Sequence, residues 1–434
     1  MRHYPWPGNR LTAAAALTLL AFLGTACGPA AGDTAAQLPQ AAQLERAYQV
    51  AATVPQLTIW TYYDISREAE AFRSKHPEVQ VNVATFPQKD YVEAYLNGLA
   101  DSAPPDLLLI GNEDIGEFNA IEGLENLEEP PYAAAAYKEA IPGNLWKLYT
   151  SFDRERLISL PVQLPTAATY YRRDLLEDSG LPGDPEALGA YLETPENWLN
   201  VARRLKEKDH YIFQWDSEPV EVSAMQGNYV REDLSFARNQ PVYQLTLDLA
   251  KEVRRAGLAL RSSVRTEPGQ EALRSGKLAM LYMGRWGVEA LEQWAPQTKG
   301  LWSMTRLPLN LYGWSGGSSL AIPSRSQSKE LAWDFACMTT QLKAPARQSS
   351  FMDLTPMDEL YRYGLTRVER QTPAPFDREL RGLWTESVTD ILENGTDTAS
   401  GLRFIESQSD SLMERDRERL LHYLGKPPES PDSK

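Results

Sequence analysis

Two carboxylate side chains follow predicted strands of this chain. Asp64 comes directly after the apolar run 57–63, and Glu113 follows the apolar run 105–111. A carboxylate can accept two hydroxyl donors, each as a charge-assisted hydrogen bond. Two carboxylates on either side of a glycosidic bond can also hydrolyse that bond when their separation is right. The sequence does not give the distance between Asp64 and Glu113, so binding of a polar ligand and hydrolysis both stay open.

Other catalytic and metal-binding motifs are missing from the sequence. The chain has four scattered histidines, His3, His76, His210 and His422. Their spacing is not that of metal ligands, and the sequence has no HExxH motif and no cysteine cluster. A GxSxG elbow and a phosphate-binding loop are also missing. We therefore expect neither a metal ion nor a cofactor.

The first part of the chain alternates between strand and helix patterns. The runs 57–63 and 105–111 predict buried strands, and the alternation of 79–86 predicts a half-buried one. The intervening segments 66–76 and 88–100 carry apolar residues on one helical face. Strands separated by helices of about a dozen residues indicate βαβ units and a parallel sheet.

The later part is richer in helix patterns. A helix is predicted to begin at Thr194-Pro195, and further helices are predicted over 240–256 and 328–342. Three glycine- or proline-punctuated apolar runs predict additional strands, at 276–287, 302–308 and 314–323. The segment 212–238 fits no pattern that we can place.

The first 26 residues have the features of a secretory signal. Arg2 and Arg10 precede the apolar stretch 12–26, which is too short to span a bilayer. The stretch ends in LGTAC, so small residues stand directly before Cys27, which resembles the lipobox of bacterial lipoproteins. We expect lipidation of Cys27, followed by a tether over 27–55 that is rich in Ala and Gln. A plain secretory signal is the alternative.

Composition narrows the class of protein further. The 434 residues carry a net charge of −15, which argues against nucleic acid as a partner. Cys27 and Cys337 are the two cysteines, so lipidation of Cys27 would leave no pair for an intramolecular disulfide. The rest of the sequence contains no second apolar stretch long enough to span a membrane, so the body of the protein is expected to be soluble.

Five segments, taken in order, resemble the extracellular solute-binding proteins of family 1, the carbohydrate-binding subunits of ABC importers related to maltose-binding protein. They are LTIWTYYD, PPDLLLIGNEDIGEF, LPVQLPTAATYYRRDLLEDSGLP, SGKLAMLYMGRWG and GGSSLAIPSRSQSKELAWDF. The resemblance implies an α/β, two-lobed periplasmic-binding-protein type II fold with interleaved lobes and a ligand cleft between them. It places lobe one at 56–162 with 280–322, and lobe two at 163–279 with 323–434.

The resemblance also implies a sugar site, where aromatic rings stack on C–H faces and polar side chains pair with hydroxyls. Asp64, Glu113 and Trp286 fall on ligand-binding positions of the family's motifs, and Trp286 is the best single candidate. Glu113 is favoured over its neighbour Asp114. The other expected ligand contacts are Tyr62 and Tyr63 at the first strand end, Gln163 in the first chain crossing, Trp314 before a glycine pair, and Trp384.

These features imply an extracytoplasmic subunit that captures a sugar or oligosaccharide and delivers it to the permease subunits of an ABC importer. We expect a monomer without enzyme activity, held at the cell membrane only by its lipid anchor. One alternative is a ferric-binding protein of the same architecture, with Tyr170 and Tyr171 as phenolate ligands, although neighbours on a strand point to opposite faces. The others are a glycoside hydrolase and a sensory lipoprotein.

Overall fold

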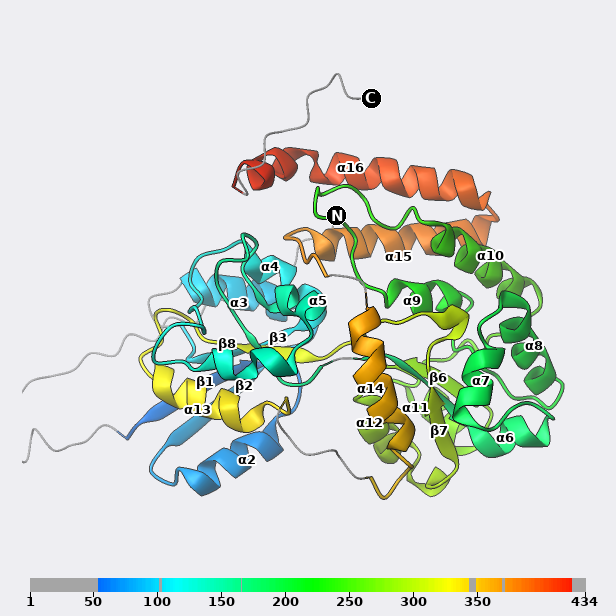
Figure 1. The fold of residues 1–434 in the computed structure, drawn as a ribbon, viewed down its shortest axis with the longest axis horizontal. Helices are drawn as coiled ribbons and strands as arrows, with labels where there is room; N and C mark the ends of the chain where they lie inside the picture. Colours follow the sequence, from blue (N-terminus) through cyan, green and yellow to red (C-terminus); the bar gives the residue numbers. More distant parts are fainter. Residues whose placement is uncertain (1–53, 101–103, 165, 343–348, 369–370, 424–434) are drawn as a thin grey trace, which may run out of the picture. The chain divides into compact units, whose positions relative to one another are not determined.

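Two β-sheets, each covered by helices, organise the part of the chain that the structure describes (Figure 1). The computed structural model describes residues 54–100, 104–164, 166–342, 349–368 and 371–423. The expected signal, Cys27 and most of the expected tether therefore lie outside the described residues.

The first sheet has five strands in the order β2-β1-β3-β8-β4. They are β1 (Gln56–Thr61), β2 (Gln80–Thr85), β3 (Leu107–Gly111), β4 (Leu160–Pro161) and β8 (Ser318–Ala321). β1 pairs in parallel with β2 and β3, as the strand and helix alternation predicted, whereas β8 runs antiparallel to β3 and β4. Every residue of the inner strand β3 is buried, while the edge strand β2 alternates, because only inner strands are covered on both sides.

Helices pack on both faces of the first sheet and bury its apolar side chains. The longer ones are α2 (Ser66–Lys75), α3 (Tyr91–Ala100) and α13 (Lys329–Thr339). The short helical turns are η1 (Asn112–Asp114), α4 (Gly116–Asn119), η2 (Ala134–Ala140), α5 (Gly143–Trp146) and η3 (Lys147–Tyr149). Phe72 of α2, Tyr95 of α3 and Phe335 of α13 join the strands in one apolar core. We call this body, residues 54–164 and 314–342, lobe one.

The second sheet has three antiparallel strands in the order β6-β5-β7. They are β5 (Ala168–Arg172), β6 (Met280–Met283) and β7 (Trp302–Thr305). Tyr170 and Tyr171 on the central strand are both fully buried, but they belong to separate apolar clusters. The expectation that these neighbours point to opposite faces is therefore confirmed. We call this body, residues 166–313, lobe two.

Helices also cover the second sheet. They are α6 (Arg173–Asp178), α7 (Pro185–Tyr191), α8 (Pro195–Lys206), α9 (Glu218–Ala224), α10 (Pro241–Arg255), α11 (Glu267–Arg274), α12 (Gly287–Trp294), η4 (Pro296–Thr298) and η5 (Pro308–Asn310). The start of α8 is as predicted, because the Thr194 hydroxyl accepts the Asn197 amide at 3.3 Å and Pro195 fills the first turn. Trp198 of α8 is buried and donates to the Tyr282 hydroxyl of β6 at 2.8 Å.

Three helices follow lobe one in the sequence: α14 (Thr355–Arg367), α15 (Asp377–Asn394) and α16 (Thr398–Tyr423). α15 and α16 run side by side and pack on α10 of lobe two (Figure 1). The first turns of α15 also contact α4 and η1 of lobe one. This helix therefore touches both lobes, and it does so next to the carboxyl end of β3.

Strand pairing corrects the lobe boundaries expected from the sequence. The expected lobe one includes residues 280–322, yet β6 and β7, which lie in this range, pair with β5 of lobe two. Residues from 323 onward were assigned to lobe two, yet α13 packs in the core of lobe one. The apolar runs are found where predicted, but an apolar run does not reveal its strand partner, because β5 and β6 pair across more than a hundred residues of chain.

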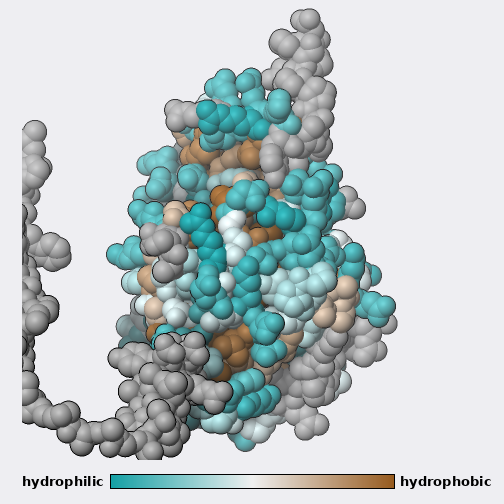
Figure 2. Space-filling view, turned by 90° about the vertical axis from the view of Figure 1, so that its left-hand side faces the viewer, coloured by the Kyte–Doolittle hydropathy of each residue, from teal (hydrophilic) through white to brown (hydrophobic). Residues whose placement is uncertain are grey.

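The face at the left of Figure 1, where α2 and α13 lie, is mostly hydrophilic (Figure 2). Hydrophobic side chains appear on it only in small separate patches. Within the described ranges, no helix combines the length and the apolar character that crossing a membrane requires.

Candidate functional site

A cavity of about 390 Å³ opens where the two lobes and α15 meet. Lobe one contributes residues at the ends of β3 and β8, and lobe two contributes α9 and the chain that follows it. The lining residues are Asn112, Glu113, Leu148, Glu221, Ala224, Met225, Gly227, Asn228, Tyr229, Arg238, Trp314, Ser315, Gly316, Gln371, Pro373, Asp377, Arg381, Trp384 and Thr385. Residues that carry carboxylates, guanidinium groups, amides and indole rings thus line one open cavity, a set that can both donate and accept hydrogen bonds.

Glu113 reaches this cavity because it lies in η1, two residues after the end of β3. Its side chain is 43% exposed, and its carboxylate lies 3.6 Å from Nη1 of Arg381 on α15. The neighbouring Asp114 is buried, accepts a hydrogen bond from the Tyr91 hydroxyl at 2.6 Å and forms an ion pair with Arg381. Burial raises the pKa of Glu113, and the Arg381 charge opposes part of that rise. Of the two neighbouring acids, Glu113 is thus the one that can meet a ligand.

Trp314, at the start of the second segment of lobe one, also lines the cavity. It is half-buried, and its indole nitrogen donates to Oε1 of Gln371 at 2.7 Å. The following glycines, Gly316 and Gly317, have φ angles of 65° and 83°, a left-handed conformation that side chains disfavour. This turn lets the backbone at Gly316 line the cavity, as the glycine pair in the sequence suggested.

Arg238 occupies the lobe-two side and was not singled out from the sequence. Its side chain is buried at 4% exposure, and its guanidinium lies 3.6 Å from the Tyr229 ring centre and 5.1 Å from that of Trp384. It donates to the carbonyls of Gly227 at 3.1 Å and Asn228 at 3.4 Å. Among the described residues, no carboxylate lies within ion-pair distance of it. The aromatic rings and carbonyls therefore stabilise this charge.

Trp384 was expected to offer an open ring to a sugar, and its surroundings differ from that expectation. The ring lines the cavity but is only 5% exposed. It packs edge-on against Tyr243 at 5.4 Å, and Arg238 covers one of its faces. Since Arg238 lies over the ring, a ligand would meet the guanidinium before it met Trp384.

Trp286, the best single candidate from the sequence, does not line the cavity but contacts a residue that does. Its indole nitrogen donates to the carbonyl of Ser315, a lining residue, at 3.2 Å. The ring also contacts Trp294 edge-on at 6.3 Å, and the Arg265 guanidinium lies 5.9 Å from its centre. A side chain at Gly284 would collide with this carbonyl, so the glycine before Trp286 permits the close approach.

The other expected contacts do not line this cavity. The Tyr62 hydroxyl pairs with Ser318 at 2.7 Å, and its ring stacks on Tyr91. Asp64 is exposed and accepts hydrogen bonds from the Ser66 amide and hydroxyl at the start of α2, which lower the pKa of its carboxyl. The remaining two expected contacts are Tyr63 and Gln163. Tyr63 is 36% exposed and lies beside Tyr62, and Gln163 is half-buried in the first chain crossing.

Two further acids line the cavity from lobe two and α15. Burial raises the pKa of Asp377 to about 7, and the Ala374 amide, which donates to it at 2.8 Å, opposes this rise. Its other carboxylate oxygen is buried without a hydrogen-bond partner among the described residues. Burial also raises the pKa of Glu221, which accepts a hydrogen bond from Ser217 at 2.6 Å. A hydroxyl donor of a ligand would satisfy the unpaired oxygen of Asp377.

Residues 61–337 match the family model of the bacterial extracellular solute-binding proteins. The chain belongs to this family. The matched range contains Glu113, Arg238 and Trp314 but ends before α15, so the α15 side of the cavity is outside the match.

Solved structures of similar fold support the two-lobed architecture. The sugar-binding protein MalE from the phytopathogen Xanthomonas citri is 20% identical with a TM-score of 0.67, over 83% of this chain and 98% of that one. The galacto-N-biose-/lacto-N-biose I-binding protein of the ABC transporter from Bifidobacterium longum, in complex with lacto-N-biose, is 15% identical with a TM-score of 0.67, over 87% and 99%.

A third solved structure is the ABC transporter associated binding protein from B. animalis subsp. lactis Bl-04, in complex with β-1,6-galactobiose. It is 15% identical with a TM-score of 0.67, over 85% of this chain and 98% of that one. Identities this low establish the fold alone, and the α/β two-lobed fold expected from the sequence is confirmed. No curated protein matches the chain.

The geometry of this solute-binding protein also bears on the alternative chemistries. In the described ranges, no group of three or more His, Cys, Asp or Glu side chains could hold a metal ion. Tyr170 donates to the Gly284 carbonyl at 2.9 Å and Tyr171 to the Gly183 carbonyl at 2.8 Å, from opposite faces of β5. Of Asp64 and Glu113, the carboxylate pair considered for hydrolysis, Glu113 lines this cavity and Asp64 does not.

Proposed function

We propose that the solute is a carbohydrate, a sugar or short oligosaccharide, bound in the cavity between the lobes. The observation that carries the proposal is the composition of the cavity, where Glu113 and Trp314 of lobe one face Tyr229 and Arg238 of lobe two. Hydroxyl groups pair well with carboxylates and guanidinium groups, and half-buried indole rings pack on sugar C–H faces. The sugar ligands named for two of the similar structures support the same class of solute.

We assign direct ligand contact to the side chains that line the cavity, among them Glu113 and Trp314. Arg238 joins them, with Trp384 supporting its guanidinium. Trp286 holds the Ser315 backbone in place and could reach a ligand only at its edge. Tyr62, Tyr63, Asp64 and Gln163 are proposed for the outer rim, where a longer oligosaccharide would extend.

The protein serves as the extracytoplasmic subunit of an ABC importer and delivers its solute to permease subunits. Cleavage before Cys27 and lipidation of this cysteine would hold it at the membrane, with residues 28–55 as a tether. We propose that it acts as a monomer and has no enzyme activity. Palmitate labelling, lost in a Cys27→Ala variant but kept in the unsubstituted protein, tests the anchor.

Thermal unfolding with a panel of mono- and oligosaccharides tests the class of solute. Because a ligand that binds only the folded state raises the unfolding temperature, a matching sugar should shift it upward. The Trp314→Ala variant should bind that sugar at least about tenfold more weakly, since the ring loses its packing on the sugar. Trp215, which is 43% exposed and outside the cavity, provides the control, and Trp215→Ala should bind as the unsubstituted protein does.

Two results would contradict the proposal. No shift with any carbohydrate, together with a purple ferric complex, would favour the metal-binding alternative. Turnover of a glycoside that is lost in Glu113→Gln would favour the hydrolase. Both alternatives have weak support in the geometry, because Tyr170 and Tyr171 donate to backbone carbonyls and Asp64 binds Ser66 at the start of α2.

A further inference from the structure

Residues 229–238, part of the segment that fits no sequence pattern, form a short hairpin. Val230 and Phe236 pair in an antiparallel bridge, and the Ala237 amide donates to the Tyr229 carbonyl at 2.7 Å. The Asp233 carboxylate closes the turn by accepting from the Ser235 amide at 2.9 Å. The hairpin thus has a base at 229 and 238 and a tip at 232–235.

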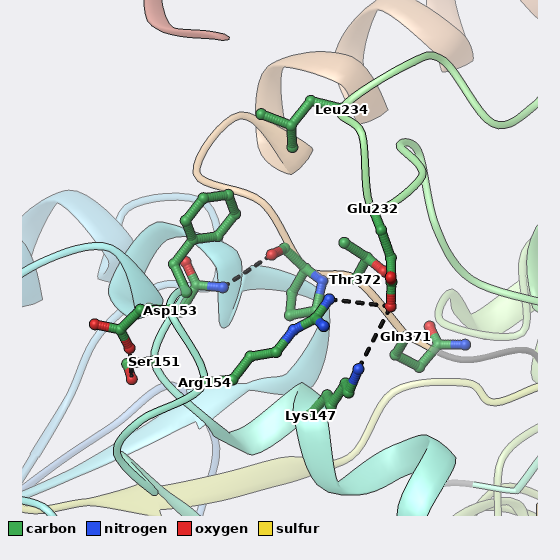
Figure 3. A pocket seen from close by; sticks show the side chains of 11 residues that line it. Lys147, Ser151, Asp153, Arg154, Glu232, Leu234, Gln371 and Thr372 are labelled. Carbon is green, nitrogen blue, oxygen red and sulfur yellow. Dashed lines mark hydrogen bonds and ion pairs between the residues drawn. The ribbon is translucent and has the colours of Figure 1, made fainter. Parts of the chain in front are cut away.

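The tip of this hairpin contacts lobe one through an ion-pair cluster (Figure 3). Oε1 of Glu232 lies 3.1 Å from Nη2 of Arg154 and 3.4 Å from Nζ of Lys147. Leu234, also at the tip, is fully buried in an apolar cluster with Phe152 of lobe one. The hairpin is therefore bound to lobe one by both charge and apolar contact.

Both partners in this contact are held by their own hydrogen bonds. In lobe one, the Arg154 amide donates to the Ser151 carbonyl at 2.8 Å, and Asp153 accepts from the Ser151 hydroxyl at 2.5 Å. On the other side, the hairpin packs on Met413 of α16 and on the start of α15. Because the backbone is already ordered on each side, forming the ion pairs orders only the side chains of Glu232, Lys147 and Arg154.

The base of the same hairpin lines the ligand cavity. Tyr229 and Arg238 face the cavity, and the Glu232 contact with lobe one lies only a few residues away along the chain. The Gln371 and Pro373 segment lines both this cavity and a smaller one of about 180 Å³ that surrounds Lys147, Arg154 and Glu232. The inter-lobe contact and the ligand site are therefore neighbours that have Gln371 and Pro373 in common.

We propose that the 229–238 hairpin is a clasp that sets solute affinity by holding lobe two against lobe one, with Glu232 as its positioning residue. This inference rests on the proposed function, because the ligand is the one bound in the cavity. A ligand that contacts both lobes binds only the arrangement in which they face each other, so any contact that favours that arrangement raises affinity. Glu232 itself does not line the ligand cavity.

The expected size of the effect follows from the exposure of the charges. The side chains of Glu232, Lys147 and Arg154 are 42%, 23% and 36% exposed, so their ion pairs are partly screened by water. For such pairs, Glu232→Gln should weaken carbohydrate affinity by about two- to fivefold. Arg154→Gln removes only one of the two ion pairs of Glu232, so it should weaken affinity less, and the double variant should bind about as weakly as Glu232→Gln alone.

The matched control is Glu122→Gln. Glu122 forms an ion pair with Arg156 at 3.4 Å within lobe one, so this change removes the same charge near the same turn without touching the clasp. Its affinity should equal that of the unsubstituted protein. Salt provides a second check. About 1 M salt should lower the carbohydrate affinity of the unsubstituted protein by a similar factor and leave the affinity of Glu232→Gln almost unchanged.

The experiment combines calorimetric affinities for the carbohydrate found in the thermal panel with small-angle scattering of the ligand-free protein. We expect Glu232→Gln to bind more weakly and to show a larger radius of gyration than Glu122→Gln. Unchanged or tighter binding by Glu232→Gln overturns the clasp while leaving the proposed function intact. If no carbohydrate binds the unsubstituted protein, the proposed function fails, and equal radii for Glu232→Gln and the unsubstituted protein overturn the clasp independently.

Discussion

The two walls of the ligand cavity are built in different ways. On the lobe-one wall, Glu113 and Gly316 sit at the ends of paired strands, β3 and β8, so the first sheet fixes their positions. On the other wall, Tyr229 and Arg238 lie on a hairpin, and Arg381 lies on α15. None of the lining residues comes from the strands of the second sheet. One wall follows from a sheet, and the other depends on packing between a hairpin and helices.

The two walls also use tryptophan differently. Trp314 is half-buried and lines the cavity, with its indole nitrogen bonded to Gln371, so we expect its ring to be available to a ligand. Trp384 is almost fully buried in an apolar cluster with Tyr243 and Phe236. Substituting Trp314 should therefore mainly lower ligand affinity, whereas substituting Trp384 should mainly lower the stability of the fold.

The largest expected effect compares these two tryptophans. Trp384→Ala should lower the free energy of unfolding by about 3–5 kcal/mol, because it leaves a cavity in a packed cluster and removes the support of Arg238. Trp314→Ala should cost only about 1–2 kcal/mol while removing most of the affinity. Urea unfolding of both variants beside calorimetric affinities measures the contrast. Equal stability losses would show that the two walls do not differ in this way.

A smaller effect is expected where α15 joins lobe one. Arg381→Met would leave the buried carboxylate of Asp114 without its ion pair, so we expect a loss of about 2–3 kcal/mol in unfolding free energy. The side chain of Arg378, one turn earlier on α15, donates to the Lys89 carbonyl at 2.8 Å and leaves no buried charge behind when it is replaced, so Arg378→Met should cost less than about 1 kcal/mol. Urea unfolding of both variants measures this difference, and similar losses would mean that the buried charge on Asp114 is of little importance.

A further expected effect, which appears only at some pH values, concerns Asp377. The pKa of Asp377 is raised to about 7 in the folded protein, so the folded state binds a proton more readily than the unfolded chain does. Stability from this group is therefore greatest in acid and falls as the pH rises from about 4 towards 7. Asp377→Asn should stabilise the protein at pH 8, where the buried carboxylate would be charged, and have little effect at pH 4, where it is already neutral.

Unfolding temperatures at the two pH values, with the exposed Asp390→Asn on the same helix as control, measure this difference. The amide can still accept the hydrogen bond from Ala374, so the change removes the charge and keeps the contact. A loss of stability at pH 8 in Asp377→Asn would contradict the assignment of burial as the main cause.

The sequence predicted the first wall well because its signals are local. The apolar run 105–111 places a strand, and Glu113 follows it, so the position of this acid could be anticipated without knowing the partner strands. The glycine pair after Trp314 likewise marked a backbone turn that the structure contains. The choice of Glu113 over Asp114 as the ligand contact agrees with their exposure, although ligand contact itself stays a prediction.

The second wall could not be predicted in this way because its signals are long-range. Arg238 lines the cavity only because Tyr229 and Trp384, from separate parts of the chain, support its guanidinium. The hairpin that carries it is held by contacts with α16 and lobe one, which no local pattern encodes. The same limit explains the lobe boundaries, since the partner of β6 is a strand far earlier in the chain.

The position of β8 has a consequence for how the chain acquires its structure during synthesis. β8 lies between β3 and β4, so the first sheet lacks an inner strand until residues 318–321 have been made. All of lobe two precedes β8 in the chain and must emerge before lobe one can close. A nascent or truncated chain that ends before Ser318 would expose the unpaired edge of the apolar strand β3, which favours aggregation. Any factor that keeps the growing chain from misfolding would therefore have to protect this edge until nearly three quarters of the sequence is complete.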